Sequence, residues 1–298
     1  MKYLSGDKLT RDISWLSSTD TCKKRNLSEL TAIKDNLIDA YLAYDTLITN
    51  YTTRLPNGIF HRDDKEEANP KKDLMIDFYE NPPIKLSEVM SKRRKDHGLN
   101  ECPYCGNPKS PDTLDHFIPK GNWSEYSIYP DNLVPQCREC APIKGEKYHK
   151  KGQDVAIYIH PIFFDIISRV GFKINTTIDG GCFKYDVICL QPRDMTEPDF
   201  QRVLRHMTGL NVKNRIIIFC HRTTAHWSRL QKNNINDVRV SFCARINEHG
   251  PMSHDNWEIA LYKSYILEQK IIDYFNSLCP SNSNVQNTVS EMIETEFQ

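Results

Sequence analysis

Four cysteines arranged as two C-x-x-C pairs constrain this chain more than any other feature of its sequence. The first pair is Cys102 and Cys105, and the second is Cys137 and Cys140. Two such pairs supply the four sulfur ligands of a tetrahedral structural zinc. The other cysteines are scattered singly, which is typical of small buried side chains in a reducing compartment. The spacing therefore predicts a zinc site that closes the segment 106–136 into a small fold.

The overall composition predicts an ordinary folded protein. Hydrophobic residues make up 39% of the 298 positions, and aromatic residues make up 10%. There is no apolar run of about 18 residues that could span a membrane, and the segment 1–15 lacks the apolar stretch of a secretion signal. We therefore expect a cytoplasmic protein with no membrane partner. The formal net charge of zero does not by itself predict a polyanionic partner.

Residues between and after the cysteine pairs carry candidate chemistry. The segment 114–119 reads LDHFIP, the segment 131–134 reads DNLV, and Lys144-Gly145 follows the second pair. Together with the cysteines, this pattern resembles the HNH endonucleases. In that family a D-H pair lies on a first strand, an N-L pair lies on a second strand, and a C-x-x-C opens a helix. The resemblance covers only the region around 100–150, with residues 121–130 as the loop between the strands. It implies a ββα-metal nuclease core.

Hydrolysis of a phosphodiester needs a base for water, a cation on the phosphate oxygens and a fixed orientation of both. His116 suits the base, because an unperturbed imidazole with a pKa of about 6.5 is largely neutral at neutral pH. The resemblance implies that Asn132 orients the far nitrogen of this ring and that Asp115 holds a catalytic Mg²⁺ or Mn²⁺. Neighbouring side chains on a regular strand point to opposite faces, so Asp115 and His116 converge on one phosphate only if the strand bends.

Position 141 departs from the family pattern. HNH enzymes of the C-x-x-C type commonly carry Asn or His directly after the last cysteine, where it completes the catalytic metal site. This chain has Ala141, whose methyl group cannot ligate a cation. Two explanations compete: a deliberate substitution that silences the enzyme, or a natural module that binds without cutting. The intact Asp115, His116 and Asn132 favour the first. Either way, we expect the chain as given to cut weakly or not at all.

Basic residues near the cysteines are candidates for binding phosphates. A zinc with four thiolates carries a formal charge of −2, so attraction of nucleic acid needs nearby Lys and Arg. The alternative is that the run before the first pair is only a solvated helix end. The candidates are Lys92, Arg93, Arg94 and Lys95 in that run, and Lys144 and Lys147 after the second pair.

Hydrophobic periodicity outside the cysteine region predicts mostly helices. Alternating residues on either side of Asp179-Gly180-Gly181 predict one β-hairpin. The predicted helices cover 27–48, 85–95, 196–207, 213–230 and 257–278. The expected fold class is α+β, with a zinc-stapled ββα-metal core embedded in a mainly helical protein with an additional hairpin. Three regions follow: a helical region with a basic lead-in (1–98), the zinc-bound core (99–165), and a hairpin-plus-helices region for binding substrate or partner (166–298).

The motif layout is also similar to HNH subunits of bacterial anti-phage systems such as Septu, in which the nuclease works with an ATPase. This similarity implies a controlled nuclease in antiviral defence, with an ATPase partner and double-stranded DNA as the expected target. The alternative is a non-catalytic zinc module that binds nucleic acid or scaffolds a defence complex. Ala141 is the sequence feature that favours this alternative.

Overall fold

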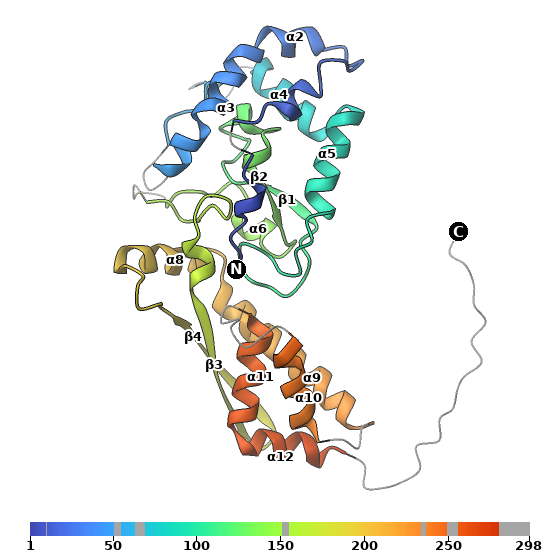
Figure 1. Ribbon diagram of the computed structural model, residues 1–298, viewed down its shortest axis with the longest axis vertical. Helices are drawn as coiled ribbons and strands as arrows, with labels where there is room; N and C mark the ends of the chain where they lie inside the picture. Colours follow the sequence, from blue (N-terminus) through green and yellow to red (C-terminus); the bar gives the residue numbers. More distant parts are fainter. Residues whose placement is uncertain are drawn as a thin grey trace, which may run out of the picture.

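The computed structural model describes residues 1–9, 11–50, 55–62, 69–150, 155–233, 237–248 and 256–279. Within these ranges the chain is α+β, with about half of it helical and two small antiparallel hairpins (Figure 1). The helices are α1 (Ser14–Ser17), α2 (Leu27–Ala32), α3 (Lys34–Thr49), α4 (Pro70–Glu80), α5 (Ile84–Lys95), α6 (Ala141–Lys144), α7 (Ile166–Arg169), α8 (Glu197–Gly209), α9 (Val212–Gln231), α10 (Val238–Glu248), α11 (Trp257–Leu267) and α12 (Gln269–Ser277). The strands are β1 (Thr113–His116), β2 (Leu133–Gln136), β3 (Gly171–Asp179) and β4 (Cys182–Leu190), and short 3₁₀ turns are η1 (Ser5–Asp7), η2 (Ser124–Tyr126) and η3 (Pro130–Asn132).

The first hairpin, β1–β2, lies at the centre of the molecule with α2–α5 around its upper side (Figure 1). Its register pairs Thr113 with Gln136 at one end and His116 with Leu133 at the other. The second cysteine pair directly follows β2, so the cysteines lie at the Thr113 end of the hairpin. His116 therefore lies at the opposite end from the cysteines. The predicted order of strand, loop, strand and helix is confirmed, although the helix α6 is a single turn.

Aromatic packing joins the N-terminal helices to the loop between β1 and β2. The rings of Tyr41 and Tyr129 are stacked with their centroids 4.4 Å apart, and the ring of Tyr44 lies edge-on to Tyr126 at 5.0 Å. Tyr41 and Tyr44 are one turn apart on α3, so they face the same side of that helix. Because all four side chains are buried, this contact fixes α3 against the loop.

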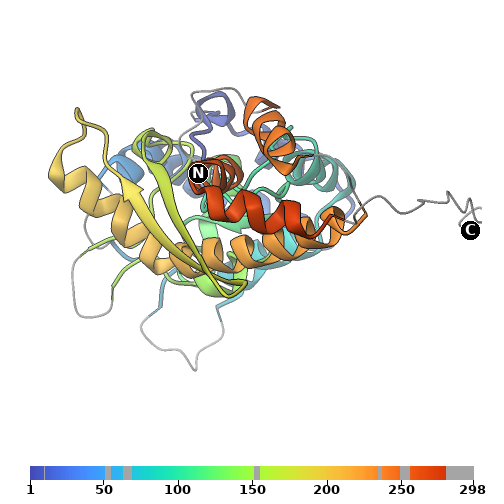
Figure 2. The ribbon, with the colours of Figure 1, turned by 90° about the horizontal axis from the view of Figure 1, so that it is seen from below.

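The predicted hairpin in the C-terminal half is confirmed as β3–β4. Gly180 and Gly181 form its tight turn with φ of +54° and +81°, the left-handed conformation that a two-residue hairpin turn requires. Figures 1 and 2 show the hairpin running beside the C-terminal helices. Its buried residues alternate along β3, which packs on α11, while β4 packs on α9.

Two predicted helices are each divided into two. The helix expected over 27–48 breaks at Ile33, whose N–H bonds to the carbonyl of Leu30 in a three-residue turn. The helix expected over 257–278 breaks at Glu268, which has an extended backbone and caps the N–H of Lys270 with its carboxylate. The prediction of continuous helices was wrong at both places, because hydrophobic periodicity persists across so short an interruption.

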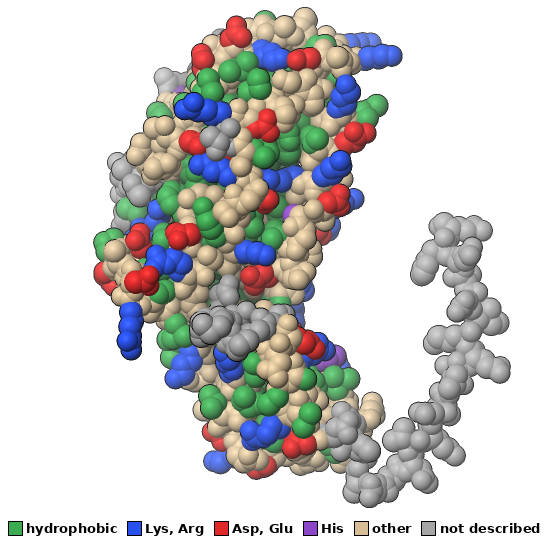
Figure 3. All heavy atoms as spheres, viewed as in Figure 1, with side chains coloured by type: hydrophobic (Ala, Val, Ile, Leu, Met, Phe, Trp, Pro, Cys, Tyr) green, Lys and Arg blue, Asp and Glu red, His purple; other side chains and the backbone are tan. Residues whose placement is uncertain are grey.

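No helix among the described residues is long and apolar enough to cross a membrane. The face seen in Figure 3 carries acidic and basic side chains interspersed with one another. This mixture agrees with the formal net charge of zero.

Candidate metal centre and histidine site

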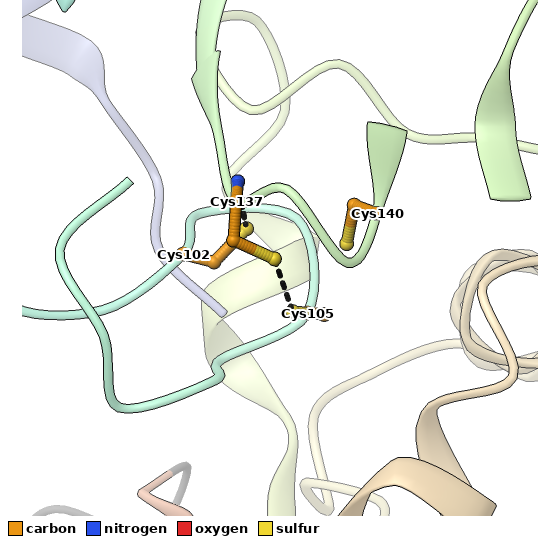
Figure 4. Close-up of side chains that lie close together, drawn as sticks. All are labelled: Cys102, Cys105, Cys137 and Cys140. Atoms are coloured by element: carbon orange, nitrogen blue, oxygen red, sulfur yellow. Dashed lines mark hydrogen bonds between the residues drawn. The ribbon is translucent and has the colours of Figure 1, made fainter. Parts of the chain in front are cut away.

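The four cysteines of the two C-x-x-C pairs converge on one point (Figure 4). Their sulfur atoms all lie within 4.8 Å of one another, and all four side chains are buried. Sulfurs bound 2.3 Å from a tetrahedral zinc are about 3.8 Å apart, and the sulfurs of Cys105 and Cys137 are 3.8 Å apart. The cluster therefore fits a closed structural metal site such as zinc, as the spacing predicted.

Backbone N–H groups near both cysteine pairs donate to the sulfurs. Gly106 adopts φ of +73°, which lets the chain double back after Cys105. The N–H of Asn107 then points at the sulfur of Cys105 at 3.4 Å, and the N–H of Cys137 points at the sulfur of Cys102 at 3.4 Å. Such N–H donors favour the thiolate form that binds a metal.

His116 ends β1 and is half-buried. Its Nε2 lies 3.0 Å from the carbonyl oxygen of Ser127, so this nitrogen carries the hydrogen and donates it. Nδ1 is then the basic nitrogen, and it has no hydrogen-bond partner among the described residues. The ring lies edge-on to Tyr79 of α4 at 4.3 Å between centroids. Burial lowers the pKa of His116 to about 3, so the imidazole is neutral at physiological pH.

Asp115 precedes His116 on β1 and has a separate set of partners. Its Oδ2 accepts a hydrogen bond from the Tyr104 hydroxyl at 2.6 Å and lies 3.0 Å from Nζ of Lys144. Lys144 is completely buried and also donates to the backbone carbonyls of His116 and Phe117. The Lys144 ammonium therefore pairs with the Asp115 carboxylate, which was expected to hold a catalytic cation.

Asn132 has a different role from the one predicted. Its Oδ1 accepts hydrogen bonds from the Tyr44 hydroxyl at 2.9 Å and from the N–H of Ile118 at 2.8 Å. Its Nδ2 donates to the carbonyls of Ile118 and Tyr126, each at 3.1 Å. These four bonds use the full capacity of the amide. Asn132 therefore orients the His116 ring only indirectly, by holding the loop that presents the Ser127 carbonyl.

Position 141 lies at the start of the short helix α6. Ala141 is the first residue of α6 and lies one turn before Lys144, so the two residues project to nearly the same side. Lys144 reaches Asp115 from there. The methyl group of Ala141 offers no ligand atom for a cation.

The predicted phosphate-binding residues divide into exposed and buried groups. Lys92, Lys95 and Lys147 are exposed, and Arg94 is half-buried. Arg93 points inward, and its guanidinium donates to the backbone carbonyls of Leu133, Asp7 and Pro130. The expectation that Arg93 and Lys144 contact nucleic acid is corrected: both cations are already bound to groups inside the fold.

Several residues near the site were not singled out from the sequence. Tyr79 covers one side of His116, and Lys120 bonds Glu80 at 2.6 Å with its ammonium 4.8 Å from the Tyr79 ring centroid. Lys120 follows LDHFIP directly, and this position could have marked it as close to His116. Tyr44, which bonds Asn132, and Arg215, which contacts the sulfur of Cys140, are distant from these partners in sequence, so no local pattern could have identified them. Tyr104 lies inside the first C-x-x-C pair, 11 residues before its partner Asp115.

One comparison with known proteins gives a partial match. The chain is 36% identical over 123 residues to Protein ea31 of Escherichia phage lambda, and the match covers 39% of this chain and 39% of that protein. The chain thus spans well under half the length of this relative, whose name states no activity. No protein-family model matches the chain, and no solved structure matches it. The functional assignment therefore rests on the geometry of the site.

Proposed function

We propose that this protein is an HNH-type endonuclease that hydrolyses phosphodiester bonds of nucleic acid, with double-stranded DNA as the expected substrate. The observation that carries the proposal is the hydrogen bond from Nε2 of His116 to the Ser127 carbonyl. This bond fixes the tautomer and leaves the unprotonated Nδ1 as a base. The histidine also ends a strand whose partner leads directly into the four-cysteine metal site.

In the proposed reaction, Nδ1 of His116 takes a proton from water as the water oxygen attacks phosphorus. The new P–O bond forms while the bond to the leaving oxygen breaks, and solvent protonates that oxygen. The low pKa keeps the base free but makes it a weak proton acceptor. A phosphate anion bound beside the ring would raise this pKa and strengthen the base. The exposed Lys92 and Lys95 and the nearby Lys120 are the cations proposed to attract that phosphate.

The residues around Asp115 do not fit a catalytic cation in the chain as given. Mg²⁺ prefers several oxygen ligands, yet the Asp115 carboxylate is engaged by Lys144 and Tyr104, and Ala141 offers no oxygen. A catalytic Mg²⁺ or Mn²⁺ at Asp115 stays a prediction for a form with a ligand at position 141. We therefore propose that the present chain cuts nucleic acid weakly or not at all.

The second candidate function is a zinc module that binds nucleic acid without cutting it. The specific observation that favours it is the buried ion pair between Asp115 and Lys144, 3.0 Å apart, because it neutralises the carboxylate without a metal. An ATPase partner in anti-phage defence belongs with either candidate and stays a prediction.

Nicking of supercoiled plasmid in Mg²⁺ or Mn²⁺ tests the two candidates. Losing even an indirect partner of a metal typically costs about 10–100-fold in activity. Ala141→Asn should therefore raise cleavage by at least that factor, and His116→Ala in the same background should abolish it. His226→Ala, which changes an exposed histidine on α9, is the matched control and should leave cleavage unchanged.

Two outcomes would contradict the nuclease proposal. If Ala141→Asn binds DNA but stays inert with both metals on plasmid, single-stranded DNA and RNA, the binding module takes its place. If Ala141→Asn cuts and the additional His116→Ala change has no effect, His116 is not the base.

A further inference from the structure

Arg215 connects the C-terminal helices to the four-cysteine cluster. It lies near the start of α9, and its side chain is buried. Its Nη1 is 3.1 Å from the sulfur of Cys140, and its Nη2 is 3.3 Å from the sulfur of Cys105 and 3.4 Å from that of Cys137. One guanidinium thus contacts three of the four candidate metal ligands.

The charge of the metal site explains why a guanidinium belongs there. Free cysteine thiols are mostly neutral at pH 7, whereas zinc bound to four thiolates carries a formal charge of −2. Binding the metal therefore creates negative charge in a buried place, which is costly unless a cation lies nearby. Arg215 supplies that cation, and its planar fork of donors can reach several sulfurs at once.

We propose that Arg215 is the charge-balancing partner of the metal site, so that metal binding and the docking of α9 on the central segment (residues 99–165) are coupled. The inference concerns the metal site alone and does not depend on nuclease activity. Because coupling between two equilibria is reciprocal, anything that loosens Arg215 should weaken metal binding, and the loaded metal should hold α9 in place.

Glu139 provides a second test, in which the expected change in metal affinity is opposite in sign to the change expected for Arg215. Its Oε2 lies 3.3 Å from Nη2 of Arg215, so a simpler explanation is that Arg215 serves only to pair with this carboxylate. In that case, removing either partner would weaken the site alike. If Arg215 instead balances the thiolates, removing the negative charge of Glu139 should favour the loaded state, while removing Arg215 should disfavour it.

The experiment measures zinc affinity of the full chain by competition with a chromogenic chelator. Arg215→Met should bind zinc about 10–100-fold more weakly, the usual cost of losing an indirect partner of a metal. Glu139→Gln should bind zinc as tightly as the unaltered chain or a few-fold more tightly. Arg215→Lys keeps the positive charge but lacks the planar fork of donors, so its zinc affinity should lie between those of Arg215→Met and Glu139→Gln. Thiolate-to-metal absorption with Co²⁺ verifies that four sulfurs still bind in each variant.

Arg202→Met is the matched control. Arg202 is a buried arginine on the neighbouring helix α8, and its guanidinium lies 4.1 Å from the centroid of the Phe164 ring. Removing it costs packing and buried charge in the same region, and zinc affinity should change by no more than about threefold. In zinc-loaded protein, backbone amides of α9 should exchange with solvent faster in Arg215→Met than in Glu139→Gln.

Two results would overturn the proposal. One is an Arg215→Met protein with zinc affinity within about threefold of Arg202→Met. The other is a Glu139→Gln protein that loses zinc affinity as strongly as Arg215→Met does. If Arg215→Met does not fold, Arg215→Lys and Glu139→Gln still decide, because charge balancing predicts weaker zinc binding in Arg215→Lys than in Glu139→Gln, whereas simple pairing with Glu139 predicts the reverse order.

Discussion

The hydroxyl of Tyr44 lies 2.9 Å from Oδ1 of Asn132, and this hydrogen bond joins helix α3 to the loop that positions His116. Asn132 in turn binds the backbone at Ile118 and Tyr126. The loop presents the Ser127 carbonyl to the His116 ring. The orientation of the proposed base therefore depends on a helix that is remote from it in sequence.

Removing the Asn132 side chain should destabilise the fold. Asn132→Ala leaves buried donors and acceptors without partners, so the free energy of unfolding in urea should fall by at least about 3 kcal/mol. Tyr44→Phe removes one of these bonds and should cost about 1–2 kcal/mol. The control is Tyr41→Phe on the same helix, since the Tyr41 hydroxyl has no hydrogen-bond partner among the described residues. Equal losses in Tyr44→Phe and Tyr41→Phe would contradict the assigned role of the Tyr44 hydroxyl.

The four-cysteine site should contribute directly to folding. Because a closed thiolate site forms only in the folded chain, Cys102→Ser or a strong chelator should unfold the central segment. Circular dichroism and elemental analysis check this, with one zinc expected per chain. Cys243→Ser changes an exposed cysteine on α10 and should alter neither quantity. Folded, freshly purified protein with far less than one metal ion per chain would show that the cysteines do not need one.

The basic run of α5 should separate into structural and binding residues. Arg93→Met loses bonds to buried carbonyls and should lower the free energy of unfolding by about 2–3 kcal/mol. Lys92→Met and Lys95→Met should change stability by less than about 0.5 kcal/mol. If these lysines contact phosphates, each change should weaken DNA binding for all sequences and lower the salt slope by about one. If the salt slope of DNA binding is unchanged in a variant that combines Lys92→Met and Lys95→Met, the run is a solvated helix end.

Acid should destabilise the fold partly through His206. This ring is fully buried, accepts the N–H of Ile159 at Nδ1 and donates from Nε2 to the Tyr104 carbonyl. Burial lowers the pKa of His206 to about 4. The unfolded state therefore takes up a proton near pH 6.5, before the folded state does. The stabilising contribution is complete above that pH and is lost as the pH falls from 6.5 toward 4.

The loss between pH 7 and pH 5 should be about 2 kcal/mol from this residue. Urea unfolding at both pH values measures it. His206→Gln removes the titrating group. Between pH 7 and pH 5 its free energy of unfolding should therefore fall by about 2 kcal/mol less than that of the unaltered chain. His221→Gln, an exposed histidine on α9, should behave like the unaltered chain. A pH dependence that is identical in all three proteins would show that His206 does not set it.

The sequence by itself determined those features that depend on local spacing. Two C-x-x-C pairs predicted the metal cluster, because each pair places two sulfurs on one tight turn. The Gly180-Gly181 turn between alternating residues predicted β3–β4, because few residue pairs permit that backbone. The two strands of the central hairpin were implied by the resemblance of the D-H and N-L segments to HNH endonucleases and not by local spacing. Asp115 and His116 lie on β1, whereas Asn132 lies in η3, directly before β2 begins at Leu133. For the metal cluster and for β3–β4, the physical cause lies within a few residues of the pattern.

Only the tertiary structure decided how the polar side chains of the site are engaged. Asn132 could bond the His116 ring or the loop, and the choice depended on Tyr44 arriving from α3. The sequence suggested that Arg93 and Lys144 are surface cations. In the folded chain both side chains point inward and donate hydrogen bonds to buried carbonyls. Arg215 reaches the cysteines because α9 folds back over them. A side chain's partner is set by what the rest of the chain brings within about 3 Å of it, and local sequence does not contain that information.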